Sequence, residues 1–301
     1  MSSSSVVKIT DVTKSFNGLK AVDELSFSIE KGIIYGLLGP NGAGKTTTIR
    51  MMMRMLYPDR GSIEILGQSL RDLKKDRIGY LPEERGLYRK MKVLDLLAFF
   101  GEVKSMKRRA ARRSGSEWLE RLGLAEVGQK KVEELSKGMQ QKVQFISTIL
   151  HEPDLVILDE PFSGLDPVNV NILMDIILEF HRKGHTVIFS THMMDQVEKL
   201  CREICLINKG RKVLDGTLSD IKKEYGRNSI SIRYAGDGSF LKDLPGVDSV
   251  NVYGNELFLR LREGADSKAI LKEVSARLDV QKFEIAEPSI HDIFVDQVSS
   301  S

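Results

Sequence analysis

The sequence predicts an α/β fold with a mainly parallel sheet, followed by a smaller α+β unit, and three observations lead to this prediction. A glycine-rich loop at residues 39–46 lies between an apolar, strand-like run at 33–38 and a helix-like segment at 47–56. After Pro153, strand-like and helix-like segments alternate, which is typical of parallel sheets covered by helices. From about Asp220 the composition changes, which indicates a separate unit.

The individual elements follow from apolar periodicity and from turn residues such as Pro58 and Gly61. In the first part of the chain, strands are expected at residues 7–15, 25–30, 33–38, 62–66, 155–158, 186–190 and 204–208. Helices are expected there at 47–56, 168–183 and 193–200, with a mostly helical region at 93–150. The smaller unit is expected to contain strands at 229–234, 247–253, 256–261 and 282–285 and a helix at 267–278.

These elements divide the chain into two domains and two tails. The larger domain is expected at residues 6–220, with a helical subdomain at about 84–150, and the smaller α+β domain at 221–298. Residues 1–5 and 299–301 are expected to be serine-rich tails. The first tail has no apolar core, so it is not expected to be a signal peptide.

The composition is that of a globular protein. The chain has 301 residues, 41% of them hydrophobic, which is enough for a sizeable core. Lys and Arg total 45 against 42 Asp and Glu, so the net charge of +3 gives no strong case for a nucleic-acid partner. No apolar run approaches the length of a membrane span. The two cysteines, Cys201 and Cys205, are expected to be reduced thiols rather than a redox pair.

The loop at residues 39–46 fits the phosphate-loop pattern at every fixed position. Its glycines allow backbone N–H groups to close around phosphate oxygens, and the following helix adds the positive end of its dipole. Lys45 is expected to reach the terminal phosphates, and the Thr46 hydroxyl to ligate Mg²⁺. The sequence therefore predicts a nucleoside triphosphate site formed by Gly39, Pro40, Asn41, Gly42, Ala43, Gly44, Lys45, Thr46 and Thr47.

Two acids follow the apolar run at residues 155–158. Asp159 is expected to belong to the Mg²⁺ site, and Glu160 to polarise an attacking water. A strand that ends in Asp-Glu is by itself weak evidence for a catalytic site, because such acidic pairs often only make the end of a strand soluble. Together with a phosphate loop, it favours a nucleotide-hydrolysing enzyme.

With these motifs, the chain resembles the nucleotide-binding subunit of an ABC transporter over roughly residues 6–220. The resemblance implies the P-loop NTPase fold in its ABC form, with a mixed sheet core and a helical subdomain. It implies that Phe16 stacks on adenine, that His192 senses the γ-phosphate, and that Asp166 lies in a dimer-contact loop. It also implies a signature motif that contacts ATP bound by the opposite subunit, formed by Ser136, Lys137, Gly138, Met139 and Gln140.

The chain departs from the family pattern at two places. Lys137 and Met139 stand where the family has glycine and glutamine, and Lys137 either adds a phosphate contact or faces solvent. Glu83 stands where the family has a glutamine that ligates Mg²⁺ and relays to the membrane partner. Its carboxylate either takes the same ligand role or turns outward and only shapes the loop.

Two further strings narrow the resemblance to one branch of the family. Residues 80–88 and 287–294 are similar to a bacterial and archaeal exporter branch that includes sodium-efflux and drug-efflux ATPase subunits. That branch carries a small C-terminal accessory domain, in agreement with the change of composition near Asp220.

The resemblance implies an ATPase that uses ATP and Mg²⁺ to power a membrane exporter at the cytoplasmic face of the cell membrane. Its partners would be a second copy of itself or a related ATPase subunit, and a separate multi-span permease that docks near residues 83–91. The alternative is a soluble ABC ATPase that acts on ribosomes or nucleic acid. Two features disfavour it: the chain has a single phosphate loop, and it lacks a long coiled-coil insertion. Import also remains open, and the sequence does not name the cargo.

Overall fold

The computed structural model describes residues 5–84, 86–226, 229–253, 256–262, 264–285 and 289–299. The expected tail residues 1–4 and 300–301 lie outside these ranges, as do Arg85 and residues 287–288 of the two branch-specific strings. The chain forms two compact units, Met1–Gly216 and Thr217–Ser301, and each is described by itself.

The first unit contains an antiparallel sheet in the strand order β2-β1-β4-β5. Its strands are β1 (Ser5–Phe16), β2 (Leu19–Glu30), β4 (Arg60–Ile65) and β5 (Gln68–Ser69). The sequence predicted only the second half of β2, because its first residues lack an apolar alternation. Those residues pair because Asn17 and Gly18 have φ angles of 49° and 84°, which are the backbone angles of a tight hairpin turn.

A six-stranded sheet forms the centre of this unit, in the order β10-β9-β3-β8-β7-β6. The pairs β6/β7, β7/β8, β8/β3 and β3/β9 are parallel, as the sequence predicted. The strands are β3 (Ile34–Leu38), β6 (Ile78–Leu81), β7 (Leu155–Asp159), β8 (Thr186–Thr191), β9 (Glu203–Asn208) and β10 (Arg211–Thr217). Sequence analysis missed β6 and β10, since β6 has only four residues and β10 is largely polar.

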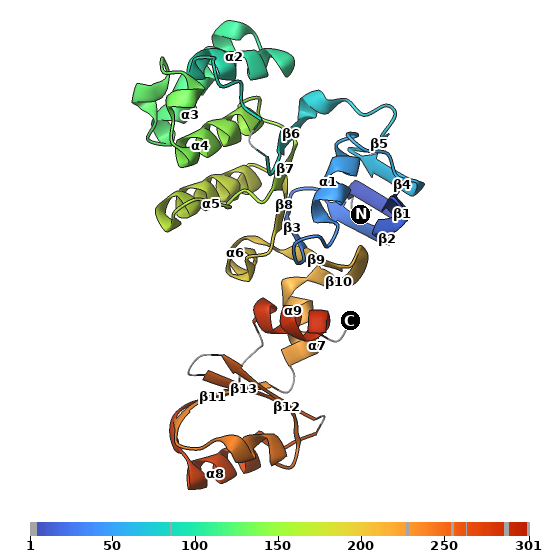
Figure 1. Cartoon of the computed structure of the whole chain (residues 1–301), viewed down its shortest axis with the longest axis vertical. Helices are drawn as coiled ribbons and strands as arrows, with labels where there is room; N and C mark the ends of the chain where they lie inside the picture. Colours follow the sequence, from blue (N-terminus) through green and yellow to red (C-terminus); the bar gives the residue numbers. More distant parts are fainter. Residues whose placement is uncertain are drawn as a thin grey trace. The chain divides into compact units, whose positions relative to one another are not determined.

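Helices surround this sheet, and Figure 1 shows α2, α3 and α4 grouped at one end of the unit. The region predicted to be mostly helical, 93–150, forms three helices, α2 (Val93–Val103), α3 (Arg108–Arg121) and α4 (Lys137–Ile149). The other helices are α1 (Lys45–Met52), α5 (Pro167–Arg182) and α6 (Met194–Leu200). Short 3-10 helices lie at Lys75–Arg77, Ala125–Val127 and Val132–Glu134.

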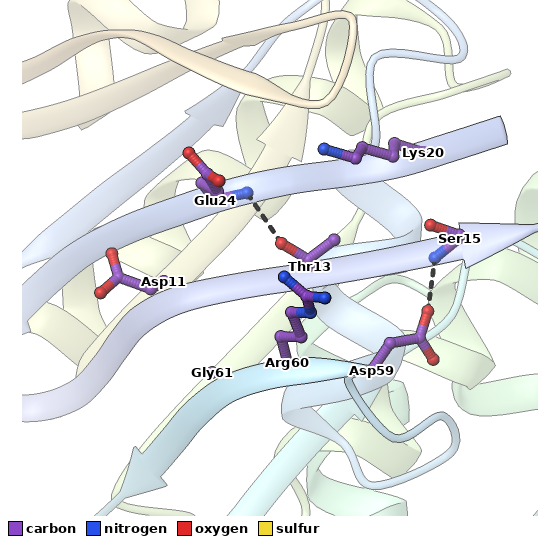
Figure 2. A pocket seen from close by; sticks show the side chains of 8 residues that line it. All are labelled: Asp11, Thr13, Ser15, Lys20, Glu24, Asp59, Arg60 and Gly61. Atoms are coloured by element: carbon purple, nitrogen blue, oxygen red, sulfur yellow. Dashed lines mark hydrogen bonds between the residues drawn. The ribbon is translucent and has the colours of Figure 1, made fainter.

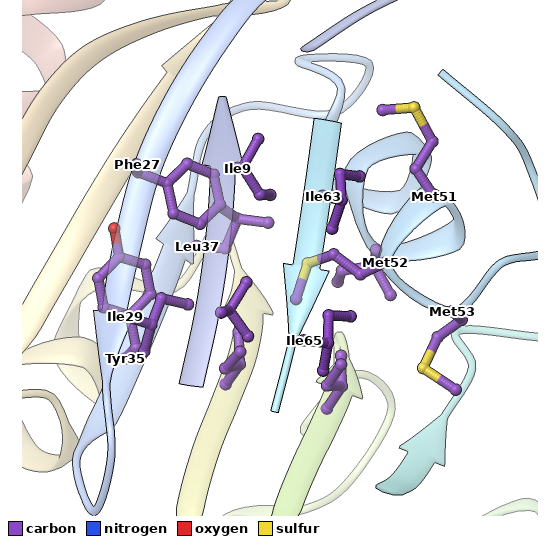
Figure 3. Close-up of a cluster of buried hydrophobic side chains, with 14 of the residues drawn as sticks. Ile9, Phe27, Ile29, Tyr35, Leu37, Met51, Met52, Met53, Ile63 and Ile65 are labelled. Carbon is purple, nitrogen blue, oxygen red and sulfur yellow. The ribbon is translucent and has the colours of Figure 1, made fainter. Parts of the chain in front are cut away.

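The main apolar core joins the two sheets and the phosphate-loop helix. Figure 3 shows the methionines at the end of α1 beside Ile63 and Ile65 of β4, with Leu37 of β3 in the same cluster. The rings of Phe27 and Tyr35 stack with centroids 5.8 Å apart, so they tie β2 to β3. The strand that carries the phosphate loop is therefore fixed from both sheets.

The second unit contains an antiparallel sheet in the order β12-β13-β11-β14, together with helices. Its elements are α7 (Leu218–Gly226), β11 (Ser229–Ala235), the 3-10 helix Ser239–Asp243, β12 (Val247–Tyr253), β13 (Glu256–Leu261), α8 (Ser267–Arg277), β14 (Asp279–Ile285) and α9 (Ile290–Ser299). Sequence analysis did not predict α7 or α9. The Ser289 hydroxyl and Asp292 form reciprocal hydrogen bonds at the start of α9, which gives this part of the C-terminal string a capping role.

Within the ranges that the structure describes, no helix is both long enough and apolar enough to cross a bilayer.

Substitution of Gly79 in β6 tests how tightly α4 packs on the sheet. A Cβ at this position would lie 2.3 Å from the Thr148 carbonyl oxygen of α4 and 3.0 Å from Cγ of Pro153. We expect Gly79→Ala to lower the free energy of unfolding by about 1–3 kcal/mol, because the backbone of α4 must move. Urea unfolding, followed by fluorescence of the single tryptophan, Trp118 on α3, measures this change.

Gly86→Ala is the matched control, since a Cβ there has no neighbour within 4 Å. Equal stability of the two variants would contradict the tight contact between β6 and α4.

Candidate functional site

The phosphate loop follows β3 directly, and two of its glycines are required by their surroundings. Gly39 and Gly44 have φ angles of 151° and 108°, which side chains rarely allow. A Cβ at Gly39 would lie 2.2 Å from the Ile207 carbonyl oxygen, and one at Gly44 would lie 2.4 Å from that of Ala21. The loop is thus wedged between β9 and β2, and Asn41 and Gly42 at its tip stay exposed.

Lys45 begins α1, and its side chain turns back into the loop. Its Nζ atom donates to the carbonyl oxygens of Gly39, at 2.8 Å, and Pro40, at 3.2 Å. The same atom lies 3.5 Å from Oε1 of Glu160, and the residue is only 5% exposed. A buried ammonium held beside open backbone N–H groups is the arrangement that binds phosphate.

Thr46, Asp159 and Glu83 meet beside Lys45, from α1, the end of β7 and the segment after β6. The Thr46 hydroxyl lies 3.3 Å from Oδ1 of Asp159 and 3.5 Å from Oε2 of Glu83. Asp159 is 1% exposed, yet its Oδ2 atom has no hydrogen-bond partner. Hydroxyl and carboxylate oxygens are the ligands that Mg²⁺ prefers, so this group of three residues fits the predicted metal site.

Burial raises the pKa of Asp159 above its usual value, and the charges of Glu83 and Glu160 raise it further. Hydrogen bonds from Ser190 and Thr46 act in the opposite direction and lower this pKa. The ionised carboxylate is therefore unfavourable in the nucleotide-free chain.

Glu160, next to Asp159 and beside Lys45, contacts His192 from the segment after β8. Nδ1 of His192 lies 3.1 Å from both carboxylate oxygens of Glu160. The backbone N–H of Glu160 donates to the Ser190 hydroxyl at 3.0 Å, and φ of Glu160 is 49°. The structure thus brings together Lys45, Glu160 and His192, three residues that the sequence placed in one site.

Sequence analysis missed Ser190, which connects the two acids. Its hydroxyl donates to Oδ1 of Asp159 at 2.6 Å and accepts from the N–H of Glu160 at 3.0 Å. Ser190 lies on β8, which pairs with β7 so that Asp159 is opposite it. Its place at the end of a parallel strand, two residues before His192, was a signal that could have identified it.

The signature segment lies at the start of α4, apart from these residues. The Ser136 hydroxyl accepts from the N–H of Met139 at 3.3 Å and so caps the helix. Gln140 donates to the carbonyl oxygens of Val132 and Leu135, which holds the preceding turn in place. Ser136 and Lys137 are exposed, and no hydrogen bond or ion pair among the described residues joins positions 136–140 to the phosphate loop.

The remaining predicted residues lie at the edges of the unit. Phe16 ends β1 and is 44% exposed, as an aromatic that receives a planar ligand must be. Asp166 caps α5, and its carboxylate accepts from the N–H groups of Val168 and Asn169 at 3.1 and 3.0 Å. These hydrogen bonds hold the pKa of Asp166 below its usual value. Its part in a dimer contact stays a prediction.

Comparison with known proteins agrees with this geometry. Residues 22–163 match a family model described as ABC transporter, and residues 216–298 match one described as the C-terminal domain of DrrA1-3-like ATP-binding proteins. The chain is 43% identical to the ABC transporter ATP-binding protein YhaQ of Bacillus subtilis (strain 168) over 295 residues. These residues make up 98% of this chain and 99% of the relative.

A second relative and a solved structure extend the comparison. The linearmycin resistance ATP-binding protein LnrL of Bacillus subtilis (strain 168) is 30% identical over 303 residues, 97% of each chain. A solved structure of an ATP-binding subunit of an ABC transporter has a TM-score of 0.69 and 30% identity, over 73% of this chain and 93% of that one.

The fold and the site thus define a P-loop ATPase, and the order of their motifs is that of ABC proteins. The chain belongs to the ATP-binding proteins of the ABC transporter family. It is an ATPase, and its C-terminal unit matches the C-terminal domain of DrrA1-3-like ATP-binding proteins, in agreement with the accessory domain that the resemblance implied. The predicted family and fold class are confirmed.

Because the ionised form of Asp159 is unfavourable in the folded chain, Asp159→Asn should stabilise the nucleotide-free protein at neutral pH. An acid with a raised pKa in the folded state contributes stability at low pH and loses it as the pH rises through that pKa. We therefore expect a thermal midpoint a few degrees higher for the variant at pH 7, and a difference that shrinks as the pH falls toward 3, where the wild-type acid becomes protonated in both states.

Thermal unfolding from pH 3 to 8 measures this, with Asp175→Asn on the exposed face of α5 as the control. A variant less stable than the wild type at pH 7 would show that the carboxylate stabilises the empty site instead.

Proposed function

We propose that the chain powers a membrane exporter by ATP-driven association of two ATPase subunits in head-to-tail orientation. One observation supports this above all: the phosphate loop, both acids and His192 meet in one place, whereas Ser136 and Lys137 are exposed at the start of α4. A site that has its base but lacks the signature contact is incomplete within one chain. A second copy or a related subunit would supply Ser136 and its neighbours to the γ-phosphate.

Mg²⁺ would be held by Thr46, Asp159 and Glu83, whose oxygens meet beside the loop. The bound ion would neutralise charge on the phosphates. Before any ligand arrives, the unpartnered Oδ2 of Asp159 and the nearby Glu83 leave excess negative charge there. The site is therefore suited to a nucleotide that arrives with a divalent cation.

The residues of the chain divide the catalytic work. The backbone of the loop and Lys45 bind the phosphates and hold the terminal one in place. Glu160 accepts a hydrogen bond from the attacking water and polarises it, while His192 holds the carboxylate and contacts the γ-phosphate. Ser190 fixes the backbone of Glu160, so the base approaches from a constant direction. Once the terminal phosphate is released, the contact with Ser136 of the second subunit is lost and the pair separates.

Transport requires a multi-span permease, because the described helices do not cross a bilayer. A cavity of about 290 Å³ borders the predicted docking segment, and its lining includes Leu87, Phe100 and Val103. Val103 is 61% exposed, so apolar surface is open to a partner there. In this proposal the chain lies at the cytoplasmic face of the membrane, with residues 6–220 as the ATPase domain and 221–298 as the accessory domain; the two compact units of the structure divide slightly earlier, after Gly216.

Glu160→Gln tests the assignment of the base. We expect this variant to bind ATP and dimerise but to hydrolyse ATP at least about a hundredfold more slowly, the size of a typical general-base contribution. Steady-state phosphate release and size-exclusion chromatography with Mg-ATP measure the two properties. Lys45→Ala should instead lose nucleotide binding itself.

Glu84→Gln is the matched control, since the Glu84 side chain is highly exposed and pairs with Arg50 at 3.4 Å, while the backbone carbonyl that accepts from Gln144 is unchanged by the substitution. Near-normal turnover in Glu160→Gln would remove Glu160 from the mechanism.

Purification from native membranes tests the transport partner. In mild detergent, the tagged chain should retain one or two multi-span proteins in fixed ratio, which mass spectrometry identifies. Val103→Glu should lose them, because it puts a charge at the apolar cavity. If only soluble proteins or ribosomes are retained, the alternative of a soluble ATPase acting on ribosomes or nucleic acid gains support and the exporter is rejected.

A further inference from the structure

Phe16 stands at the tip of the hairpin between β1 and β2, where the backbone is fixed from two directions. On one side, the two-residue turn at Asn17 and Gly18 returns the chain, so that Phe16 pairs with Leu19. On the other side, the carboxylate of Asp59, just before β4, reaches the two residues that precede Phe16.

Asp59 makes three hydrogen bonds to the end of β1. Its Oδ2 atom accepts from the N–H of Ser15 at 2.7 Å, and Oδ1 accepts from Nζ of Lys14 at 2.7 Å. Its own N–H donates to the Thr13 carbonyl oxygen at 2.8 Å. Figure 2 shows the Asp59 carboxylate pointing from β4 toward Ser15 on β1. One side chain therefore fixes both the strand end and the lysine beside it.

Lys14 lies against the ring of Phe16. Its Nζ atom is 5.6 Å from the ring centroid, within the range of a cation–π contact. The lysine side chain is largely buried and is paired with Asp59. Burial and the ion pair together hold the ammonium in place against the ring. The ammonium covers part of the ring, and the exposed part of Phe16 remains open to another planar group.

We propose that Asp59 is a positioning residue for the base of the bound nucleotide. It holds Lys14 on one side of Phe16 and fixes the end of β1, which leaves the open side of the ring for the adenine to stack on. This inference rests on the proposed contact between Phe16 and adenine. Because the phosphate loop lies on other elements, Asp59 should affect the affinity for the base and not for the triphosphate.

The test compares two ligands of the full chain, Mg-ATP and Mg-tripolyphosphate, by isothermal titration calorimetry. Tripolyphosphate carries the phosphates without the base. We expect Asp59→Ala to raise the dissociation constant for ATP about three- to tenfold, the range of an exposed cation–π contact combined with partly lost base stacking. The dissociation constant for tripolyphosphate should stay unchanged.

Two further variants separate the contributions of Asp59. Asp59→Asn can still accept from the N–H of Ser15 but loses the ion pair with Lys14, so its effect on ATP should lie between wild type and Asp59→Ala. Asp72→Ala is the control, since Asp72 is an exposed aspartate on the turn after β5 that bonds only Ser69 there. It should bind both ligands as the wild type does.

Phe16→Ala completes a double-mutant cycle. It should weaken ATP binding at least as much as Asp59→Ala, and the double variant should lose little more, because both act through one ring. If Asp59→Ala weakens both ligands equally, or leaves ATP binding unchanged while Phe16→Ala weakens it, the role of Asp59 is rejected. If Phe16→Ala itself binds ATP normally, the contact between Phe16 and adenine is wrong, while the phosphate site at Lys45 is unaffected.

Discussion

The burial of an acidic strand end beside the phosphate loop is the constraint on which the site depends. Asp159 is closed off from solvent with one carboxylate oxygen unpartnered, and the nearby charges of Glu83 and Glu160 make its ionisation harder. Lys45 offsets only part of this charge, because its ammonium is turned toward loop carbonyl oxygens and lies 3.5 Å from Glu160. Burial above all, and to a smaller extent the neighbouring carboxylates, disfavour the ionised form of Asp159 in the empty site, and a ligand that brings positive charge favours that form.

The parallel sheet makes this arrangement possible. Because β3, β7 and β8 run parallel, their carboxyl ends lie at the same edge of the sheet. The phosphate loop, Asp159 and Ser190 are therefore all found at that edge. The Ser190 hydroxyl then connects the neighbouring strands β8 and β7. It donates to the Asp159 carboxylate and accepts from the backbone N–H of Glu160. The geometry of the base, Glu160, therefore depends on strand pairing rather than on its own exposed loop.

The sequence predicted those parts of the site that depend on the spacing of residues within a motif. It did not predict the parts that depend on pairing between segments far apart in the chain. The phosphate loop, the two acids and His192 stand in the expected places because each belongs to a motif within a few residues of a strand end. Ser190 was missed because its partner lies 31 residues away along the chain. The polar strand β10 and the first part of β2 carry no apolar pattern, and only their pairing neighbours make them strands. The cap that Asp166 forms on α5 is different: it is a local contact, and the resemblance assigned Asp166 only to a dimer-contact loop.

The two ends of the proposed nucleotide site are carried by different sheets. The phosphate loop extends from β3 of the parallel sheet, whereas Phe16 and Asp59 belong to the antiparallel sheet. The packing of Figure 3 is one rigid link between them: Phe27 stacks on Tyr35, and the end of α1 fills the space against β4. Because a well-packed core transmits displacement, a change in that packing alters the distance between the base contact and the phosphate contacts. Nucleotide affinity in this fold is therefore a property of the core as well as of the residues that touch the ligand.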